Sequence, residues 1–354
     1  MLVIVLVFAL LLTAAVTTFL RRAAVDTLIA RNRESMARAE ALARGGVRLG
    51  TALLIEDRLL DAEAGGSQND LVEDADEEEA ESDAEPGLGL DTLDERWARI
   101  QNVEIETESG GKLRLQLEDA GARLNINAVF TPNEDGELSD RVQPFLIALL
   151  EKVIDEMQGP AHEKLYEVRD LADNLIDYVD DDDLRQGGGP EDEYYQEQKP
   201  PYRAANRPVL SIDELRLVEG FDGPLVEALE PYLTVHPYAG GYGVNLNTAP
   251  PHVLALLFYD DGVDMRLAKE DVVERILKVR KEGGIVCQGQ SAEGCTPIEE
   301  IVTNSNTIHP PPGFVSDVFT VMAEARVGDA RRTVEAVVDR GQGAQPLLLS
   351  WRVR

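Results

Sequence analysis

The first 20 residues of the chain, MLVIVLVFALLLTAAVTTFL, contain no charged side chain. A helix rises about 1.5 Å per residue, so a helical run of this length spans about 30 Å, the thickness of the hydrocarbon core of a bilayer. An apolar segment of this length is stable only when lipid or protein removes it from water. We therefore predict a single transmembrane helix over residues 1–20 that anchors the remainder of the chain.

A cleaved secretory signal is the alternative interpretation of this run. The apolar core of a signal peptide is only about 7–15 residues long, which favours a permanent anchor. Arg21 and Arg22 follow the run directly, and the positive-inside rule would place that side of the membrane in the cytoplasm. A short basic leader before Met1 in the precursor would remove this conflict. We expect the body of the protein to lie outside the cytoplasm.

The charge of the chain limits its partners. Its 354 residues include 34 Lys and Arg against 66 Asp and Glu, a formal net charge of −32. A surface of this sign repels nucleic acid and anionic lipid, and it attracts cations or basic proteins. Nucleic acid is therefore a poor candidate ligand. The length of the chain predicts two or three folded units rather than one core.

The chain has two cysteines, Cys287 and Cys295, in the segment CQGQSAEGC. A short loop that contains glycine brings two Cβ atoms within the reach of a disulfide, which we predict if the compartment is oxidising. A pair of reduced loop thiols is the alternative. The sequence offers no second CxxC and no cluster of His residues, which argues against a zinc site.

The segment after the apolar run keeps a helical pattern. Residues 23–62 have apolar side chains at helical spacing, so we predict that the membrane helix continues into solvent. Gly45 and Gly46 are the place where this helix is expected to weaken, because glycine costs a helix about 1 kcal/mol relative to alanine. The acidic segment that follows, VEDADEEEAESDAEP over residues 72–86, predicts a solvated spacer.

Two later segments alternate apolar and polar residues, as strands do. VEIETESGGKLRLQLED alternates around Gly110, and FTVMAEARVGDARRTVEAVVDR alternates around Gly328, with LLLSWRVR after it. Each alternation predicts a β-hairpin. The residues between them, about 125–312, have three- and four-residue apolar spacing, which predicts short helices. We therefore predict an α+β fold in which an all-helical unit is inserted into an antiparallel sheet.

Four motifs in this order resemble a known family. They are EDAGARLNINA (118–128), LADNLIDYVDDDD (171–183), PPYRAANRPVLSIDELRLVEG (200–220) and VNLNTAPPHVLALL (244–257). Together with the apolar N-terminal helix and the first hairpin, they resemble minor pseudopilin K of the type II secretion system over nearly the whole chain. The resemblance implies a pilin-like sheet split by a large SAM-like helical domain. The regions we expect are a transmembrane helix (1–20), a helical stem with the acidic loop and first hairpin (21–124), the inserted domain (125–312) and the closing strands (313–354).

The resemblance also implies a function. K-type subunits are non-enzymatic parts of the pseudopilus that cap its periplasmic tip with minor pseudopilins I and J and help to initiate assembly. Such a protein is a single-pass inner-membrane protein with its body in the periplasm, and prepilin peptidase processes its precursor. K-type subunits lack the Glu that other pilin-like subunits carry at the fifth position, and this chain has Val5. A carboxylate in lipid needs a partner from the subunit ahead, and a tip subunit has none.

Carboxylates gather around a glycine-rich turn near residue 187. Calcium takes about six to eight oxygen ligands with flexible geometry, so such a cluster suits this metal. The spacing is not that of an EF-hand, and an acidic run after a helix is commonly a solvated face. K-type pseudopilins bind calcium in their helical domain, so the resemblance implies a calcium site here. The ligands we expect are Asp177, Asp180, Asp181, Asp183, Glu191 and Asp192.

The sequence contains no Ser/His/Asp, Cys/His or Walker pattern, so we predict no catalytic site. An alternative function is a membrane-anchored nucleic-acid-binding protein, because VNLNTAPPHVLALL resembles helix-hairpin-helix modules. This segment lacks the basic, glycine-rich hairpin that contacts phosphate, and the acidity of the chain opposes such binding. A membrane-anchored hydrolase with paired carboxylates is a third interpretation, for which the sequence indicates no nucleophile.

Overall fold

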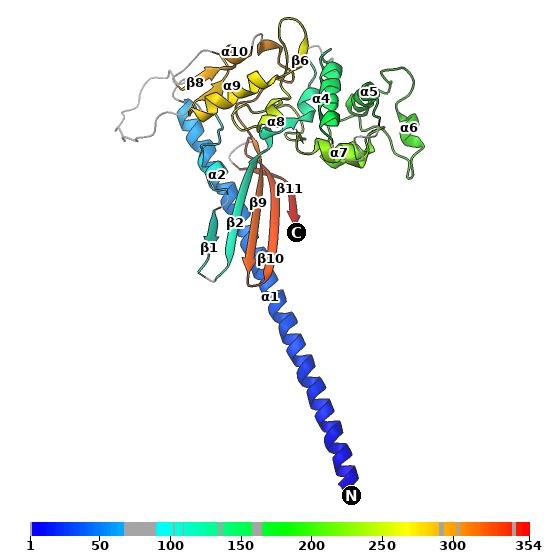
Figure 1. Ribbon diagram of the computed structural model, residues 1–354, viewed down its shortest axis with the longest axis vertical. Coiled ribbons are helices and arrows are strands. Elements are labelled where there is room, and N and C mark those ends of the chain that lie inside the picture. Colours follow the sequence, from blue (N-terminus) through cyan, green and yellow to red (C-terminus); the bar gives the residue numbers. More distant parts are fainter. Residues whose placement is uncertain are drawn as a thin grey trace, which may run out of the picture.

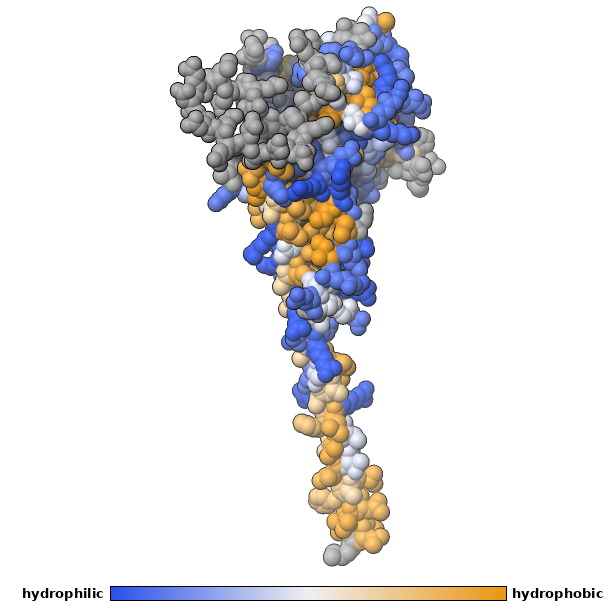
Figure 2. Space-filling view, turned by 90° about the vertical axis from the view of Figure 1, so that its left-hand side faces the viewer, coloured by the Kyte–Doolittle hydropathy of each residue, from blue (hydrophilic) through white to orange (hydrophobic). Residues whose placement is uncertain are grey.

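A single helix, α1 (Leu2–Gly66), forms the spine of the molecule, and its N-terminal half projects far beyond the rest of the chain (Figure 1). Figure 2 shows that this projecting part is apolar toward its N-terminal end. An 18-residue window within it has a mean hydropathy of 2.7, and the protein buries none of that window. Since such a surface is stable only in lipid, α1 is a candidate membrane span.

The structure, a computed structural model, describes residues 2–66, 90–101, 103–108, 110–133, 136, 138–157, 165–289, 294–302, 305–341 and 345–354. The acidic segment predicted as a spacer, residues 72–86, lies outside this set. Its character therefore stays a prediction.

The second half of α1 packs on a sheet through side chains at four-residue spacing. Ala39, Ala43 and Val47 are buried there, followed by Leu54 two turns later. This spacing places them on one face of the helix, because a helix has about 3.6 residues per turn. The face covers strands β2 (Lys112–Asp119), β9 (Val318–Val327) and β10 (Ala330–Asp339), so the stem and the sheet share one core.

The helix does not weaken at its glycine pair. Residues on both sides of Gly45 and Gly46 remain helical, and Gly46 is buried against the sheet. A Cβ on Gly46 would lie 2.7 Å from Leu113 Cδ1 and 2.8 Å from Ala323 Cβ, whereas a Cβ on Gly45 would meet open space. Gly46 therefore serves close packing between helix and sheet, and the expected weak point is wrong.

The sheet has five antiparallel strands in the order β1-β2-β9-β10-β11. The strands are β1 (Glu104–Glu106), β2 (Lys112–Asp119), β9 (Val318–Val327), β10 (Ala330–Asp339) and β11 (Leu347–Val353). Strand β2 lies beside β9, so that Leu115 is opposite Ala323 across a sequence separation of about 200 residues. Both predicted hairpins form, around Gly110 and Gly328. The predicted α+β fold with a split antiparallel sheet is confirmed.

The residues between β2 and β9 form the insert, which lies across the end of the sheet that is far from the N-terminus (Figure 1). Its core is a hydrophobic cluster separate from the one under the sheet. The insert is not all-helical as predicted, because its described residues also form three pairs of short strands, β3–β4, β5–β6 and β7–β8. A short helix, α2 (Arg96–Arg99), precedes β1. The elements of the insert are η1 (Ala120–Ala122), β3 (Leu124–Asn125), α3 (Ile126–Val129), α4 (Val142–Glu156), α5 (Val168–Val179), α6 (Asp192–Gln196), η3 (Ile212–Leu217), α7 (Gly223–Leu229), β4 (Leu233–Thr234), α8 (Pro251–Leu254), β5 (Phe258–Asp260), β6 (Met265–Leu267), α9 (Glu270–Lys281), β7 (Ile285–Cys287), β8 (Cys295–Pro297), α10 (Ile298–Ile301) and η4 (Ser305–Thr307).

Candidate metal centre

Three carboxylates meet where α5 ends and α6 begins. Asp177 lies in the last turn of α5, Asp180 is the C-cap of that helix, and Glu191 is the N-cap of α6. The loop between them turns back through Gly188 and Gly189, which have φ angles of 84° and 106°, a region that favours glycine. One oxygen from each carboxylate lies within 4.8 Å of the others.

Asp177 and Glu191 are buried, Asp180 is half-buried, and their carboxylates accept few hydrogen bonds. Glu191 is 2% exposed and Asp177 is 4% exposed. Among the described residues, both side-chain oxygens of Glu191 and Oδ1 of Asp180 have no hydrogen-bond partner, whereas Asp177 Oδ1 accepts one bond from the Gln186 N–H at 2.9 Å. Leaving such a group unpaired in the interior is costly.

The pKa values of the cluster reflect this burial. Loss of solvent, followed by the charges of Asp180 and Asp177, raises the pKa of Glu191 to about 8. Loss of solvent and the charge of Asp182 raise the pKa of Asp180 to about 7, and burial also raises the pKa of Asp177. The charge of Arg185 lowers the pKa of Asp177 but does not offset burial, so the ionised form of the cluster is disfavoured.

The other three expected ligands lie elsewhere. Asp181 and Asp183 are exposed on the loop, and only the backbone carbonyl of Asp183 reaches the cluster, where it accepts the Glu191 N–H at 3.3 Å. The Asp192 carboxylate accepts the Ala204 N–H at 3.1 Å and lies 3.5 Å from the Arg203 guanidinium. The structure thus brings together three of the six residues that we named.

Sequence reasoning missed one oxygen donor, Asn206. Its Oδ1 is buried and has no partner among the described residues, while its Nδ2 donates to the Asp182 carbonyl at 2.6 Å. Asn206 has a φ of 44°, in the left-handed region that few residues other than glycine and asparagine adopt. Nothing in the motif RAANRP marks it as a ligand. Asn206 lines the same pocket as Asp180, and its amide oxygen is a donor of the kind that a hard cation such as calcium prefers.

The second half of the insert contains the predicted disulfide. Cys287 at the end of β7 and Cys295 at the start of β8 are bonded, with their Cα atoms 5.9 Å apart. The two strands are parallel neighbours. The bond closes the loop between them, and the prediction made from the spacing of the two cysteines is confirmed.

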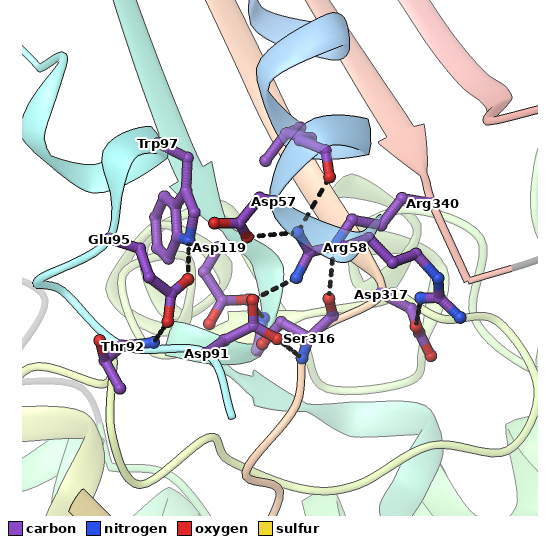
Figure 3. Close-up of polar contacts among 12 residues, drawn as sticks. Asp57, Arg58, Asp91, Thr92, Glu95, Trp97, Asp119, Ser316, Asp317 and Arg340 are labelled. Carbon is purple, nitrogen blue, oxygen red and sulfur yellow. Dashed lines mark hydrogen bonds and ion pairs between the residues drawn. The ribbon is translucent and has the colours of Figure 1, made fainter. Parts of the chain in front are cut away.

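A second polar cluster joins the stem, the sheet and the insert (Figure 3). Arg340, at the end of β10, is 3% exposed, and its guanidinium donates to Asp57 at 2.7 Å and to Asp91. It also donates to the backbone carbonyls of Leu54 at 3.1 Å and Ser316 at 3.2 Å. One buried side chain therefore connects α1, the segment before α2 and the end of the insert.

The carboxylates at this junction are compensated, unlike those beside α5. Glu95 accepts the indole N–H of Trp97 at 2.5 Å and the Thr92 N–H at 2.7 Å, while Arg340 binds the two neighbouring aspartates (Figure 3). Burial and then the charge of Asp91 raise the pKa of Glu95 to about 8. The junction has its own cation and acts as a structural connection.

A second set of hydrogen bonds holds the start of the insert in place. The buried Asp119 carboxylate, at the end of β2, accepts the Gly121 N–H at 2.6 Å and the Thr248 hydroxyl. Asn245, from the middle of the insert, donates to the Ser316 hydroxyl near its end at 2.8 Å and to Asp119 at 3.4 Å, so the three parts meet here. These bonds fix the insert at the top of the sheet.

A long N-terminal helix that is apolar and exposed in its first half, and packed on an antiparallel sheet in its second, defines a membrane-anchored pilin-like subunit. The chain is 32% identical over 268 residues to type II secretion system protein K of Aeromonas hydrophila, a match that covers 73% of this chain and 75% of that protein. The chain belongs to the type II secretion system protein K family.

Further comparisons agree with this assignment. The family described as type II secretion system (T2SS), protein K, matches residues 122–238. Type II secretion system protein K of Pseudomonas aeruginosa is 27% identical over 256 residues, covering 72% of this chain and 68% of that protein. The fold is similar to a chain in the crystal structure of the GspK–GspI–GspJ complex of enterotoxigenic Escherichia coli, with a TM-score of 0.59 and 18% identity over 92% of this chain and 99% of the other.

Proposed function

We propose that this protein is a single-pass inner-membrane protein whose body lies in the periplasm, where it caps the tip of the type II secretion pseudopilus. The observation that carries the proposal is the position of the insert, which lies across the end of the sheet farthest from the apolar N-terminus (Figure 1). Helix α1 would join the helical bundle of the fibre. The insert would then block the addition of a further subunit above it.

The same proposal assigns its partners. The similar Escherichia coli chain was solved in a complex of proteins K, I and J. We propose that this subunit likewise assembles with the minor pseudopilins I and J, helps to initiate the fibre, and acts without catalysing a reaction. We also propose that prepilin peptidase processes its precursor.

The carboxylate cluster supports a calcium site as part of this function. Asp177, Asp180 and Glu191 would hold the ion, with Asn206 as a further oxygen donor. The ion would supply further positive charge beside the three carboxylates, and it would hold the end of α5 against the start of α6. Its role is therefore structural and keeps this part of the insert rigid.

A deletion of the insert tests the capping role. The two ends of the insert are adjacent, because a Cβ on Gly121 would lie 2.8 Å from the Ser316 hydroxyl. Residues 122–315 are therefore replaced by a short glycine linker, and circular dichroism and thermal melting establish that the stem and sheet still fold. The expected result is altered initiation or length of the pseudopilus and impaired secretion. Secretion and fibre length equal to those of the full chain would refute capping.

The nucleic-acid-binding alternative gains no support from the geometry. The residues of VNLNTAPP that such a module would present are turned inward: Asn245, Asn247 and Thr248 are all buried and bonded to protein groups. They are therefore unavailable to phosphate. A gel-shift assay at low and high salt, with no shift expected, checks this interpretation.

A further inference from the structure

We propose that the free edge of β11 binds an extended segment of a neighbouring subunit, which adds to the sheet as a sixth strand. The inference rests on the proposed assembly for the identity of the neighbour. The segment we expect has apolar side chains and at least one acidic side chain. The reasons lie in the two edges of the sheet, in the backbone of β11 and in the side chains beside it.

The two edges of the sheet differ. Strand β1 forms one edge with three residues, and Glu104 and Glu106 place charges on it. Short, charged edges of this kind prevent unwanted strand pairing. Strand β11 forms the other edge with seven residues, LLLSWRV, which include no proline and no acidic residue. In the part of the chain that the structure describes, β10 is its only strand neighbour.

The backbone of β11 offers hydrogen-bonding groups on its outer side. Arg354 and Thr333 exchange both backbone bonds, Arg354 N–H to Thr333 at 2.8 Å and Thr333 N–H to Arg354 at 3.0 Å. Bonded and non-bonded pairs alternate along an antiparallel ladder. The regular register therefore directs the N–H and C=O groups of Val353 and Trp351 away from β10. Such groups are the binding site for an added strand.

The same positions carry exposed apolar side chains. Trp351 is 38% exposed and Val353 is 42% exposed, and they lie opposite Ala336 and Val334, which face the core under α1. Leu348, 53% exposed, lies opposite Val338 on that face. These three side chains extend the apolar face of the sheet past α1. The side chains of an added strand would pack against them.

The charges beside β11 indicate the chemistry of the partner. Arg352 and Arg354 flank the outward-directed residues, and the Arg44 guanidinium of α1 lies 6.0 Å from the centre of the Trp351 ring. Glu335 lies 4.0 Å from Arg352 and 3.5 Å from Arg354, so one carboxylate pairs with two guanidinium groups. Arg44 also pairs with Glu40 at 2.6 Å, so three arginines lie beside two carboxylates, a small excess of positive charge within a chain of net charge −32. It therefore favours a strand that carries an acidic residue.

Amide hydrogen exchange on the full chain in detergent, alone and with proteins I and J, tests the inference. The expected result is exchange at least about tenfold slower at the Trp351 and Val353 amides in the complex. Arg352 provides an internal control, because the ladder directs its N–H toward β10. The variant Val353→Pro removes an outward N–H and is expected to weaken binding about tenfold.

A matched variant and three outcomes complete the test. Glu106→Pro, on the opposite edge, is expected to leave binding unchanged. A complex that forms with unchanged exchange at Trp351 and Val353 overturns this inference and leaves the proposed function intact. Failure to form any complex with I and J overturns both. If exchange at these amides is already slow in the chain alone, and slows further as the concentration of the chain rises, a second copy occupies the edge. That result would also refute the proposal.

Discussion

Asn127 and Asn247 each make the same pair of hydrogen bonds with one valine, at two separate places in the insert. Asn127 bonds both backbone groups of Val209, with Oδ1 accepting at 2.8 Å and Nδ2 donating at 2.9 Å, and Asn247 does the same with Val286 at 2.8 and 2.9 Å. The N–H of each asparagine donates to the side chain of the asparagine two residues earlier. The motifs LNIN and VNLN thus build one local structure twice.

We predict that Asn127→Ala and Asn247→Ala each destabilise the protein. Each change leaves a buried N–H and a buried C=O without a partner, at a cost of about 1–3 kcal/mol per group. Urea unfolding of the purified chain measures the loss. Asn174→Ala is the control, since that partly buried side chain donates one bond, to Glu219 at 3.2 Å, and a loss below about 1 kcal/mol is expected.

The carboxylate cluster predicts opposite effects of one substitution with and without calcium. Glu191→Gln removes a carboxyl whose ionisation is opposed by burial and by neighbouring carboxylates, so in EGTA the variant is expected to be at least as stable as the unmodified chain. Calcium at about 100 times its dissociation constant is expected to stabilise the unmodified chain by about 2.7 kcal/mol and the variant much less. Thermal melting in EGTA and in calcium chloride measures both. The exposed Asp181→Asn is the control, and equal calcium shifts in all three chains would contradict the site.

Arg340 predicts a large effect of a single buried cation. Arg340→Met removes the guanidinium that binds the buried Asp57 and Asp91, which is expected to cost about 3–5 kcal/mol. Adding Asp57→Asn and Asp91→Asn to this variant is expected to restore part of that loss, because the uncompensated charges are removed. Arg58→Ala breaks an exposed pair with Asp317 and one hydrogen bond to the Gly341 carbonyl, and it is expected to change stability by about 1 kcal/mol or less.

Alanine substitutions at the two glycines of α1 are expected to change the free energy of unfolding in opposite directions. Gly45→Ala adds a methyl group in open space and is expected to stabilise the helix by up to about 1 kcal/mol. Gly46→Ala places a methyl group against Leu113 and Ala323 and is expected to destabilise the packed stem by about 1–3 kcal/mol. Urea unfolding of both variants in the same buffer compares them. Equal effects would contradict the close packing of helix and sheet.

His309 predicts acid sensitivity of the insert. Burial, and then the charge of Arg141, lower the pKa of His309 from 6.5 to about 4. Between these values the unfolded chain binds a proton that the folded chain does not, so stability is full above about pH 6.5 and falls as the pH drops toward 4. The His309→Gln variant is expected to lose less stability over this range. His252→Gln, at an exposed position, is the control, and an unchanged profile in His309→Gln would contradict the assignment.

The candidate metal centre was only partly predictable. The acidic composition after α5 predicted a cation site there, and three of the named carboxylates do lie together. It did not indicate which carboxylates are buried, since Asp180 and the exposed Asp181 are neighbours and differ only in where the helix end directs them. Asn206 was missed because its contact depends on a left-handed backbone conformation.

The sequence by itself determined the local elements of this protein. An uncharged run of 20 residues requires lipid, alternating residues form strands, and two cysteines eight positions apart lie within bonding reach. The tertiary structure alone decided how these elements combine. Gly46 is required by side chains of two distant strands, and Arg340 is held by carboxylates 249 and 283 residues away in the chain. Contacts of this kind depend on burial in the folded chain, which no local pattern records.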